Sequence, residues 1–208
     1  MLMDNIMDSI KKRRSIKKYS PRKVKSVILR EVLEASGWAP SAHNAQPWRF
    51  IVLTEQSAKQ ALAEAMADAW TADMAKDGVT VEAQKHEASI ERFTHAPALI
   101  VACLTMEDMK VYSDERRQRS ERDLAMQSLG AAIQNMLLAA HAEGLGACWF
   151  SAPSFCKETV RKVLKIPEVV EPQALIALGY AAEKPQVPQR KPLENYAYRG
   201  SWGKTLQL

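Results

Sequence analysis

The sequence is poor in cysteine, and its cysteines show no paired spacing. Cys103, Cys148 and Cys156 are an odd number in a chain of 208 residues. This pattern argues against a disulfide-stabilised scaffold, because small secreted domains of that kind carry an even set of cysteines at framework spacings. It is consistent with a reducing compartment, so we expect a cytoplasmic protein.

The sequence also lacks any feature that would divide the chain. Residues 1–180 contain no Gly/Ser-rich or Pro-rich linker, and no repeat period recurs. A chain of 208 residues is long enough to bury a sizeable core of its own. We therefore expect one domain over residues 1–208, in which only the stretch with Pro185, Pro188 and Pro192 forms an extended tail.

No segment has the layout of an export signal or a membrane anchor. The basic cluster near the amino terminus follows a few apolar residues and does not precede a long apolar run, unlike a secretory signal. The longest uncharged stretch, residues 124–142, is long enough to cross a bilayer but contains five polar side chains. A buried helix fits that composition better, and we expect no membrane partner.

The glycine-based nucleotide motifs are missing too. No Gly-x-Gly-x-x-Gly follows a strand-like run, and no Gly-x-x-x-x-Gly-Lys-Ser/Thr occurs. A separate dinucleotide-binding domain does not fit in this length of chain. Because His86, His95 and His141 share no metal-ligand spacing with one another or with the cysteines, we predict no metal site.

Basic charge is concentrated in one part of the chain. The formal net charge is +5, and ten of the basic residues lie between Lys11 and Arg30. Such a cluster is compatible with a nucleic-acid or membrane patch. However, the segment has one aromatic residue for stacking, Tyr19, and several of its cations belong to a phosphate-binding pattern. We therefore expect no nucleic-acid partner, with polyanion binding as an alternative.

The most informative segment is a polar loop pinned by two prolines. Residues 39–50 read Ala-Pro-Ser-Ala-His-Asn-Ala-Gln-Pro-Trp-Arg-Phe and run directly into an apolar strand. Ser41, Asn44 and Gln46 offer hydroxyl and carboxamide groups, and a carboxamide presents donors beside an acceptor, which suits the edge of a planar heterocycle. Upstream, residues 11–19 supply guanidinium groups and a hydroxyl that match phosphate oxygens. A ring site plus a phosphate site indicates a nucleotide-like cofactor.

The spacing of apolar residues predicts an α+β fold with about four strands. Strand-length runs occur at residues 48–54, 98–104, 147–151 and 173–180. Helical patterns occur at residues 4–13, from 26 to shortly before Pro40, 57–70 with Ser57 as the cap, 81–93, 115–143 and 156–164. Because the run 98–104 is apolar throughout, we expect a sheet that helices cover on both faces.

The predicted helix at residues 115–143 is apolar on most sides after its charged first turns. A helix of this kind has to be buried on all sides. One domain can cover one face of the helix with its sheet, and a second copy of the chain would cover the other, with Gly130, Ala131 and Ala132 permitting close approach. We therefore predict a dimerisation helix, with a central core helix in a monomer as the alternative.

Several segments, taken together, resemble a known family. They are residues 13–17 (Arg-Arg-Ser-Ile-Lys), the loop 39–50, residues 144–149 (Gly-Leu-Gly-Ala-Cys-Trp), the strand 172–180 and residues 190–194 (Arg-Lys-Pro-Leu-Glu). With these segments in this order, the chain resembles the flavin-dependent nitroreductases over essentially its whole length. The resemblance implies a nitroreductase-like α+β fold with a mainly antiparallel central sheet of four to five strands. It also implies a homodimer that exchanges carboxy-terminal tails and holds FMN at the interface with contacts from both chains.

The resemblance also assigns candidate cofactor-binding residues. Those for the phosphate and ribityl chain are Arg13, Arg14, Ser15, Lys17 and Arg190. Those for the ring are Pro40, Ser41 and Ala42 across the interface, the polar positions Asn44 and Gln46, and the turn Trp149, Phe150 and Ser151, whose backbone N–H groups would face the flavin N5 and O4 edge. Asn44 and Gln46 could instead cap turns. Lys17 stands where many relatives have arginine, which keeps the charge but not the bidentate fork.

Flavin carries the redox chemistry itself, so we expect no catalytic side chain. His43 occupies a variable position of the loop motif, and we expect it to be a pocket wall or solvent-facing residue rather than a proton donor. The resemblance implies that NADH or NADPH reduces FMN, which then reduces nitroaromatics, quinones or similar acceptors at the same place by a ping-pong mechanism.

Two other functions stay open at this point. Residues 112–135 are similar to the flavin-binding domain of deazaflavin biosynthesis proteins, so a deazaflavin, its precursor or another flavin-dependent reduction is an alternative. A non-catalytic flavin-binding or polyanion-binding protein is the other. The sequence ranks neither the acceptors nor NADH against NADPH.

Overall fold

The computed structural model describes residues 6–206 and is built around one antiparallel sheet. The strand order is β1-β2-β4-β3, and each neighbouring pair is antiparallel. The strands are β1 (Trp48–Leu53), β2 (Ala98–Thr105), β3 (Gly146–Phe150) and β4 (Val170–Gly179). The predicted α+β class and sheet are confirmed, and the four apolar runs all form strands.

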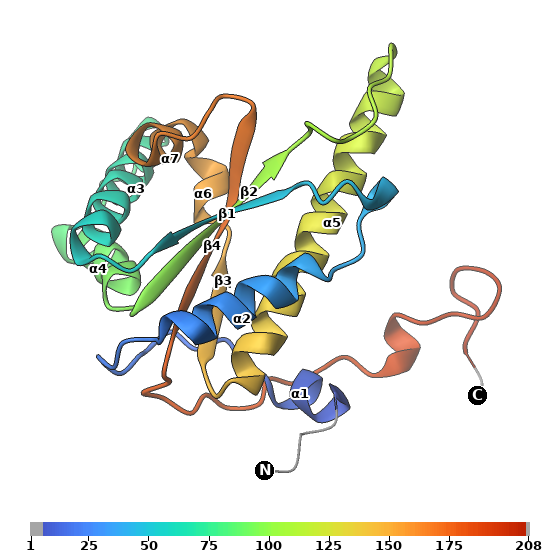
Figure 1. Ribbon diagram of the computed structural model, residues 1–208, viewed down its shortest axis with the longest axis horizontal. Coiled ribbons are helices and arrows are strands. Elements are labelled where there is room, and N and C mark those ends of the chain that lie inside the picture. The colour runs from blue at the N-terminus through green and yellow to red at the C-terminus, as the bar shows by residue number, and fades with distance from the viewer. Residues whose placement is uncertain (1–5, 207–208) are drawn as a thin grey trace.

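Helices cover both faces of this sheet (Figure 1). They are α1 (Ile6–Lys12), α2 (Ser26–Gly37), α3 (Gln56–Lys76), α4 (Ala83–Thr94), α5 (Glu115–Ala142), α6 (Ala152–Phe155) and α7 (Lys157–Leu164), with short 3-10 turns η1 (Ala42–Asn44) and η2 (Leu193–Asn195). Along β2, Ile100, Ala102 and Leu104 pack with α2 and α5, whereas the alternate residues pack with α3, α4 and α7. This alternation explains why the whole of β2 is buried and reads as one apolar run.

The long helix α5 buries one face in its own chain. Its buried stripe runs from Ala125 through Leu129 and Met136 to Ala140. On other sides Leu124 is 38% exposed, and Gly130, Ala131 and Leu138 are half-buried. The helix is therefore not covered all round by this chain, and an apolar surface of small and aliphatic residues is left for another element. Its use as a dimer interface stays a prediction.

The predicted helix boundaries differ from the observed ones at several places. Ser57 does not cap α3, which begins at Gln56 after Glu55 without a side-chain cap and continues to Lys76. The alanine-rich stretch beyond Trp70 keeps the helix going, because alanine has the highest helix propensity. The helix expected at residues 156–164 is α7, and a separate short helix, α6, precedes it. Residues 4 and 5 of the first predicted helix lie outside the described part.

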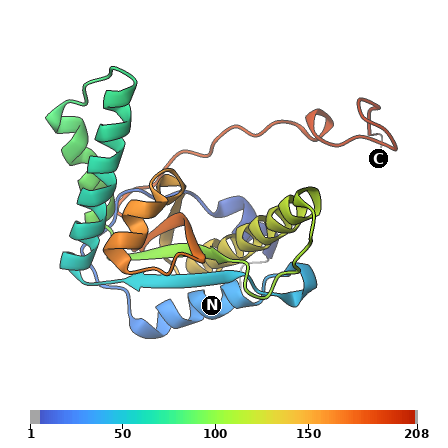
Figure 2. The same cartoon turned by 90° about the horizontal axis from the view of Figure 1, so that it is seen from above.

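The carboxy-terminal tail leaves the body of the molecule, as Figure 2 shows. It folds only on itself near its end, where Tyr198 bridges Thr205 and its ring lies 4.8 Å from the Trp202 ring. Trp202 is 90% exposed. The extended tail is as predicted, and its exchange between chains stays a prediction. Among residues 6–206 no helix has the length and apolarity needed to cross a membrane.

Candidate cofactor-binding site

The amino-terminal segment extends the sheet beyond its β3 edge. The backbone N–H of Ile16 donates to the Ala147 carbonyl at 3.1 Å, and that of Ser20 donates to the Tyr180 carbonyl at 2.8 Å. Gly146 permits this approach, because a Cβ on it would lie 2.7 Å from the Cβ of Ile16. Ile16 is buried, whereas its neighbours Ser15 and Lys17 are exposed. The predicted phosphate motif therefore lies along an edge strand.

Cys148, on β3, is the point around which several predicted site residues gather. Burial raises the pKa of the Cys148 thiol, while Lys17, a hydrogen bond with Ser15, and the charges of Arg13 and Arg92 act to lower it. Burial dominates, so the thiol stays protonated and does not neutralise these cations. The structure thus brings Arg13, Ser15 and Lys17 to one place, and it adds Arg92 from α4.

Arg13, Arg14 and Arg190 form a cluster of guanidinium groups, which we call the phosphate cluster. Burial lowers the pKa of Arg13, and the charges of Arg14 and Arg190 lower it further. Repulsion of this kind is relieved when a phosphate binds, because its oxygens accept bonds from several guanidinium groups. Arg14 Nη1 donates to the carbonyls of Lys11 at 2.6 Å and Arg13 at 2.7 Å, which orients that side chain.

A carboxylate near the phosphate cluster is already occupied. Glu183 Oε1 accepts the backbone N–H groups of Lys17 at 2.6 Å and Lys18 at 3.1 Å. It therefore holds the amino-terminal segment against the start of the tail. Arg13, Arg14 and Glu183 line one cavity of about 440 Å³, together with Leu137 and His141 from the last turns of α5. The cavity, with the cations on its wall, can hold an anionic group.

The ring loop, residues 41–46, has a strained backbone. His43, Asn44 and Gln46 have φ values of 57°, 54° and 46°, in the left-handed region that non-glycine residues rarely adopt. Ser41 Oγ accepts the Gln46 N–H at 3.1 Å, which closes the loop. The side-chain carboxamides of Asn44 and Gln46 are exposed and bond no described residue, so neither caps a turn here. They remain available to a ligand.

The ring loop is anchored to the first half of α5. The Ala42 N–H donates to Ser128 Oγ at 3.2 Å, and His43 Nε2 lies 3.0 Å from Glu121 Oε1. The phosphate cluster's cavity instead reaches Leu137, nine residues further along the helix, which is about 14 Å at 1.5 Å per residue. Figure 1 shows η1 beside one end of α5 and α1 beside the other. One chain therefore does not bring the ring loop and the phosphate cluster together.

A second cavity, of about 770 Å³, opens at the end of β3. Its walls are largely aromatic and aliphatic, and the lining residues include Trp70, Phe93, Phe150, Ser151, Phe155 and Arg92. Phe93 and Phe150 pack edge to face with their ring centroids 5.2 Å apart. Trp149 lies on the opposite face of the sheet, which α5 covers. Its ring is close to that helix, because a Cβ placed on Gly130 of α5 would be 3.9 Å from the ring. Of the predicted turn, Phe150 and Ser151 line this cavity and Trp149 does not.

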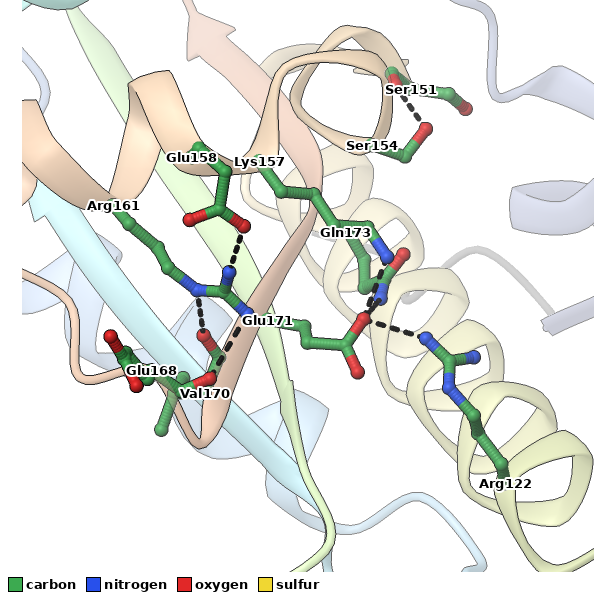
Figure 3. Close-up of polar contacts among 10 residues, drawn as sticks. All are labelled: Arg122, Ser151, Ser154, Lys157, Glu158, Arg161, Glu168, Val170, Glu171 and Gln173. Atoms are coloured by element: carbon green, nitrogen blue, oxygen red, sulfur yellow. Dashed lines mark hydrogen bonds and ion pairs between the residues drawn. The ribbon is translucent and has the colours of Figure 1, made fainter. Parts of the chain in front are cut away.

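A charged network around Glu171 joins several elements of the fold (Figure 3). The Glu171 carboxylate accepts Lys157 Nζ at 2.6 Å, Arg122 Nη2 at 2.6 Å and Gln173 Nε2 at 3.2 Å. Burial alone would raise the pKa of Glu171, but the bonds and charges of Lys157 and Arg122 outweigh burial and lower the pKa. These contacts join α5, α7 and β4.

Arg92 is a site residue that the sequence did not indicate. It lies on α4 in a segment with many charged residues, where a single arginine has no distinguishing pattern. Only the fold shows that it faces Cys148 and the β3 cavity. Within residues 6–206, no group of three or more histidine, cysteine, aspartate or glutamate side chains is arranged to hold a metal ion.

Comparison with known proteins identifies the family. The model of the nitroreductase family matches residues 10–180. The chain is 32% identical to an NADH dehydrogenase of Thermus thermophilus over 209 aligned positions, covering 88% of this chain and 90% of that protein.

Solved structures share the fold. A BluB-like flavoprotein from Clostridium difficile has a TM-score of 0.78 at 23% identity, covering 95% of this chain and 99% of that one. Nitroreductase A of Vibrio parahaemolyticus has a TM-score of 0.74 at 19% identity, covering 98% of this chain and 79% of that one. On the family match, which spans most of the sequence, the chain belongs to the nitroreductase family.

Proposed function

We propose that this protein is an FMN-dependent homodimeric oxidoreductase that passes electrons from NADH or NADPH to quinones, nitroaromatics or similar acceptors. The observation that carries the proposal is the separation of two half-sites along α5. One half-site has cations for a phosphate, the other has free carboxamides for a ring, and one chain does not join them. A cofactor between two chains would use both.

The phosphate cluster fits the phosphate of FMN. Arg13, Arg14 and Arg190 would bind its oxygens, and Ser15 would add a hydroxyl donor from the same edge. Lys17 would lie beside the ribityl chain. Arg13 is half-buried, and the neighbouring charges of Arg14 and Arg190 lower its pKa. The donor set therefore suits a dianionic ligand better than a neutral one.

The partner's ring loop would complete the site. Two copies of α5 packed through the half-buried surface around Gly130 and Ala131 would bring each loop toward the other chain's phosphate cluster. Pro40, Ser41 and Ala42 would then line the ring across the interface, and Asn44 and Gln46 would offer donors and acceptors to its polar edge. The strained backbone of the loop is formed in advance, which lowers the ordering cost of binding.

The β3 cavity would lie next to the reactive edge of the ring. The backbone of Phe150 and Ser151 would face the N5 and O4 positions, with Trp149 supporting the turn from the other face of the sheet. When bound, FMN supplies the two-electron chemistry. Arg92 would place a positive charge where reduction adds a negative one, and fixed charges aimed at developing charge are efficient stabilisers.

Donor and acceptor would use the same space in turn. The sequence has no dinucleotide motif, so NADH or NADPH would dock over the ring and leave before the acceptor enters, which gives ping-pong kinetics. The β3 cavity, about 770 Å³ with aromatic walls, has room for a planar ring of either kind. The Thermus thermophilus relative is named an NADH dehydrogenase, which supports a nicotinamide donor.

We place the protein in the cytoplasm, without nucleic-acid or membrane partners. Its cysteines Cys103, Cys148 and Cys156 are all free, which fits a reducing compartment. Two of the ten basic residues between Lys11 and Arg30, namely Arg13 and Arg14, belong to the phosphate cluster.

An anaerobic absorbance titration tests the proposed function. The FMN-loaded protein is mixed with NADH, NADPH and reduced deazaflavin in turn, and the oxidised flavin band is followed before and after menadione or nitrofurazone is added. We expect bleaching by a nicotinamide and recovery with either acceptor. Failure to retain FMN would overturn both half-sites, and bleaching by the deazaflavin alone would move the function to deazaflavin metabolism.

A further inference from the structure

A buried carboxylate on α5 has no role in the proposed electron path. Glu121 is 3% exposed, and its Oε1 accepts the backbone N–H of Lys110 at 3.1 Å. The same oxygen lies 3.0 Å from Nε2 of His43 in the ring loop. A buried carboxylate is costly unless it is paired and hydrogen-bonded. Glu121 therefore depends on the ring loop for a partner.

The structure holds the His43 imidazole from two sides. Its backbone is left-handed, with φ at 57°, and the neighbouring Ala42 is fixed by its bond to Ser128. The carboxylate of Glu121 fixes Nε2. The side chain is still 33% exposed, and no described residue hydrogen-bonds Nδ1. One nitrogen is thus held inside the protein, and the other is open on the loop proposed to face the ring.

This arrangement is a carboxylate–imidazole pair. A carboxylate at one ring nitrogen fixes the orientation of the imidazole and stabilises its protonated form, which leaves the second N–H to act as an acid. Among residues 6–206, Glu121 is the charged side chain that pairs with the imidazole. Lys110, in the segment before α5, contributes its backbone N–H to the same carboxylate.

Contrary to the expectation from the sequence, we propose that His43 is the proton donor to the acceptor and that Glu121 is its positioning residue. This inference rests on the proposed function. A quinone acceptor gains two electrons and one proton as hydride from the reduced flavin, and it needs one more proton at a carbonyl oxygen. The imidazolium Nδ1–H supplies that proton: its N–H bond breaks, an O–H bond forms on the hydroquinone, and the neutral imidazole regains a proton from water.

Two acceptors separate proton delivery from electron delivery. Menadione needs a proton with its electrons, whereas ferricyanide takes electrons alone. In anaerobic stopped-flow experiments on the FMN-loaded protein, His43→Gln should slow flavin reoxidation by menadione roughly 10²-fold and leave reoxidation by ferricyanide unchanged. The matched control is His86→Gln, because His86 also lies beside a carboxylate, 2.9 Å from Asp68, but lines neither the β3 cavity nor the ring loop. It should change neither rate.

Glu121→Gln tests the positioning role with the same two acceptors. Without the carboxylate the imidazole loses the contact that holds Nε2, so reoxidation by menadione should slow and reoxidation by ferricyanide should not. In the flavin-free protein, the Nε2–H signal of His43 in NMR spectra should exchange faster with water in the same variant. A merely structural role for Glu121 would change reoxidation by both acceptors alike and leave that signal in place.

The outcomes separate this inference from the proposed function. Menadione reoxidation at the wild-type rate in His43→Gln, or equal slowing with both acceptors, would overturn the proton-donor role, and the nicotinamide-driven cycle would still stand. Failure of NADH and NADPH to bleach the wild-type flavin would instead contradict the proposed function. In that case the NMR measurement still tests the pair, and an Nε2–H signal of His43 that exchanges equally fast in the wild type and in Glu121→Gln would overturn it.

Discussion

The two half-sites are held by different means. The phosphate cluster stands on the edge of the sheet, where backbone bonds from Ile16 and Ser20 fix the amino-terminal segment to β3 and to the residue after β4. The ring loop is instead held by side chains, chiefly Ser128 and Glu121 of α5, with Arg49 of β1 donating from Nη1 to the Gln46 carbonyl at 3.3 Å. In the first half-site, guanidinium groups without an ion-pair partner among the described residues lie on a segment that backbone bonds fix to the sheet. In the second, a strained backbone is held by side-chain bonds. We infer that substitutions at the first affect binding most, and those at the second affect loop geometry.

Loss of a guanidinium from the phosphate cluster should have the largest effect. In Arg13→Ala, FMN affinity should fall roughly 10- to 100-fold, since bonds to charged groups contribute about 1.5–3 kcal/mol. The control is Arg117→Ala, whose arginine pairs with Asp114 at the start of α5. FMN dissociation constants from fluorescence titration measure the difference. Equal losses in the two variants would show that the phosphate site is wrongly assigned.

A methyl group at the sheet edge should weaken the support of the first half-site. In Gly146→Ala the new Cβ would meet the Ile16 side chain at 2.7 Å, so the amino-terminal segment has to shift. We expect a loss of about 1–3 kcal/mol in the free energy of unfolding. Gly37→Ala, where nothing lies within 4 Å, is the control and should be neutral or slightly stabilising. Urea denaturation compares them, and equal stability would mean that the segment does not pack tightly on β3.

The Glu171 network joins α5 to α7 and β4 and should make stability depend on acid pH. Because the folded-state pKa of Glu171 is lowered from 4.5, its stabilisation is present above the unfolded pKa and is lost as pH falls through the folded pKa. Glu171→Gln should therefore lower the free energy of unfolding by about 1 kcal/mol near neutral pH. The difference in unfolding free energy between wild type and variant should disappear below about pH 4. Glu158→Gln, with an exposed carboxylate, is the control. A gap that persists at low pH would contradict the pairing.

Loss of a single loop anchor should have the smallest effect. Ser128→Ala removes the acceptor for the Ala42 N–H and should cost about 1 kcal/mol of unfolding free energy. Ser120→Ala, whose hydroxyl donates to the Arg116 carbonyl one turn earlier in the same helix, is the control. Hydrogen exchange at Ala42 should quicken in the first variant and not in the second. Unchanged exchange would show that α5 does not anchor the loop.

The sequence predicted the sheet well because its strands are short apolar runs with clear ends. The run at residues 98–104 appears as β2 (Ala98–Thr105), and the loop before Trp48 leads into β1 as expected. The predicted start of α3 was wrong. Ser57 is a residue type that commonly caps helices, but the helix begins one residue earlier, at Gln56, without a side-chain cap. Helix ends depend on such local contacts, and residue type alone does not fix them.

The site could be predicted only where its residues form a local motif. The sequence predicts Arg13, Ser15 and the ring loop as site residues because each lies in one short segment. Arg92 is not, because its position depends on how α4 packs over the sheet. The Glu121–His43 pair is also hidden, because its members come from segments far apart in sequence and meet only after the loop turns left-handed.

The central claim is that one FMN site is completed by two chains, and subunit complementation tests it most directly. A heterodimer is made from one chain with Arg13→Ala and a second with Asn44→Ala and Gln46→Ala, and its FMN stoichiometry and affinity are measured. If the sites are shared, one site in the heterodimer has an intact phosphate cluster and an intact ring loop, so one FMN per dimer should bind with wild-type affinity. Weak binding at both sites would show that each chain builds its site alone.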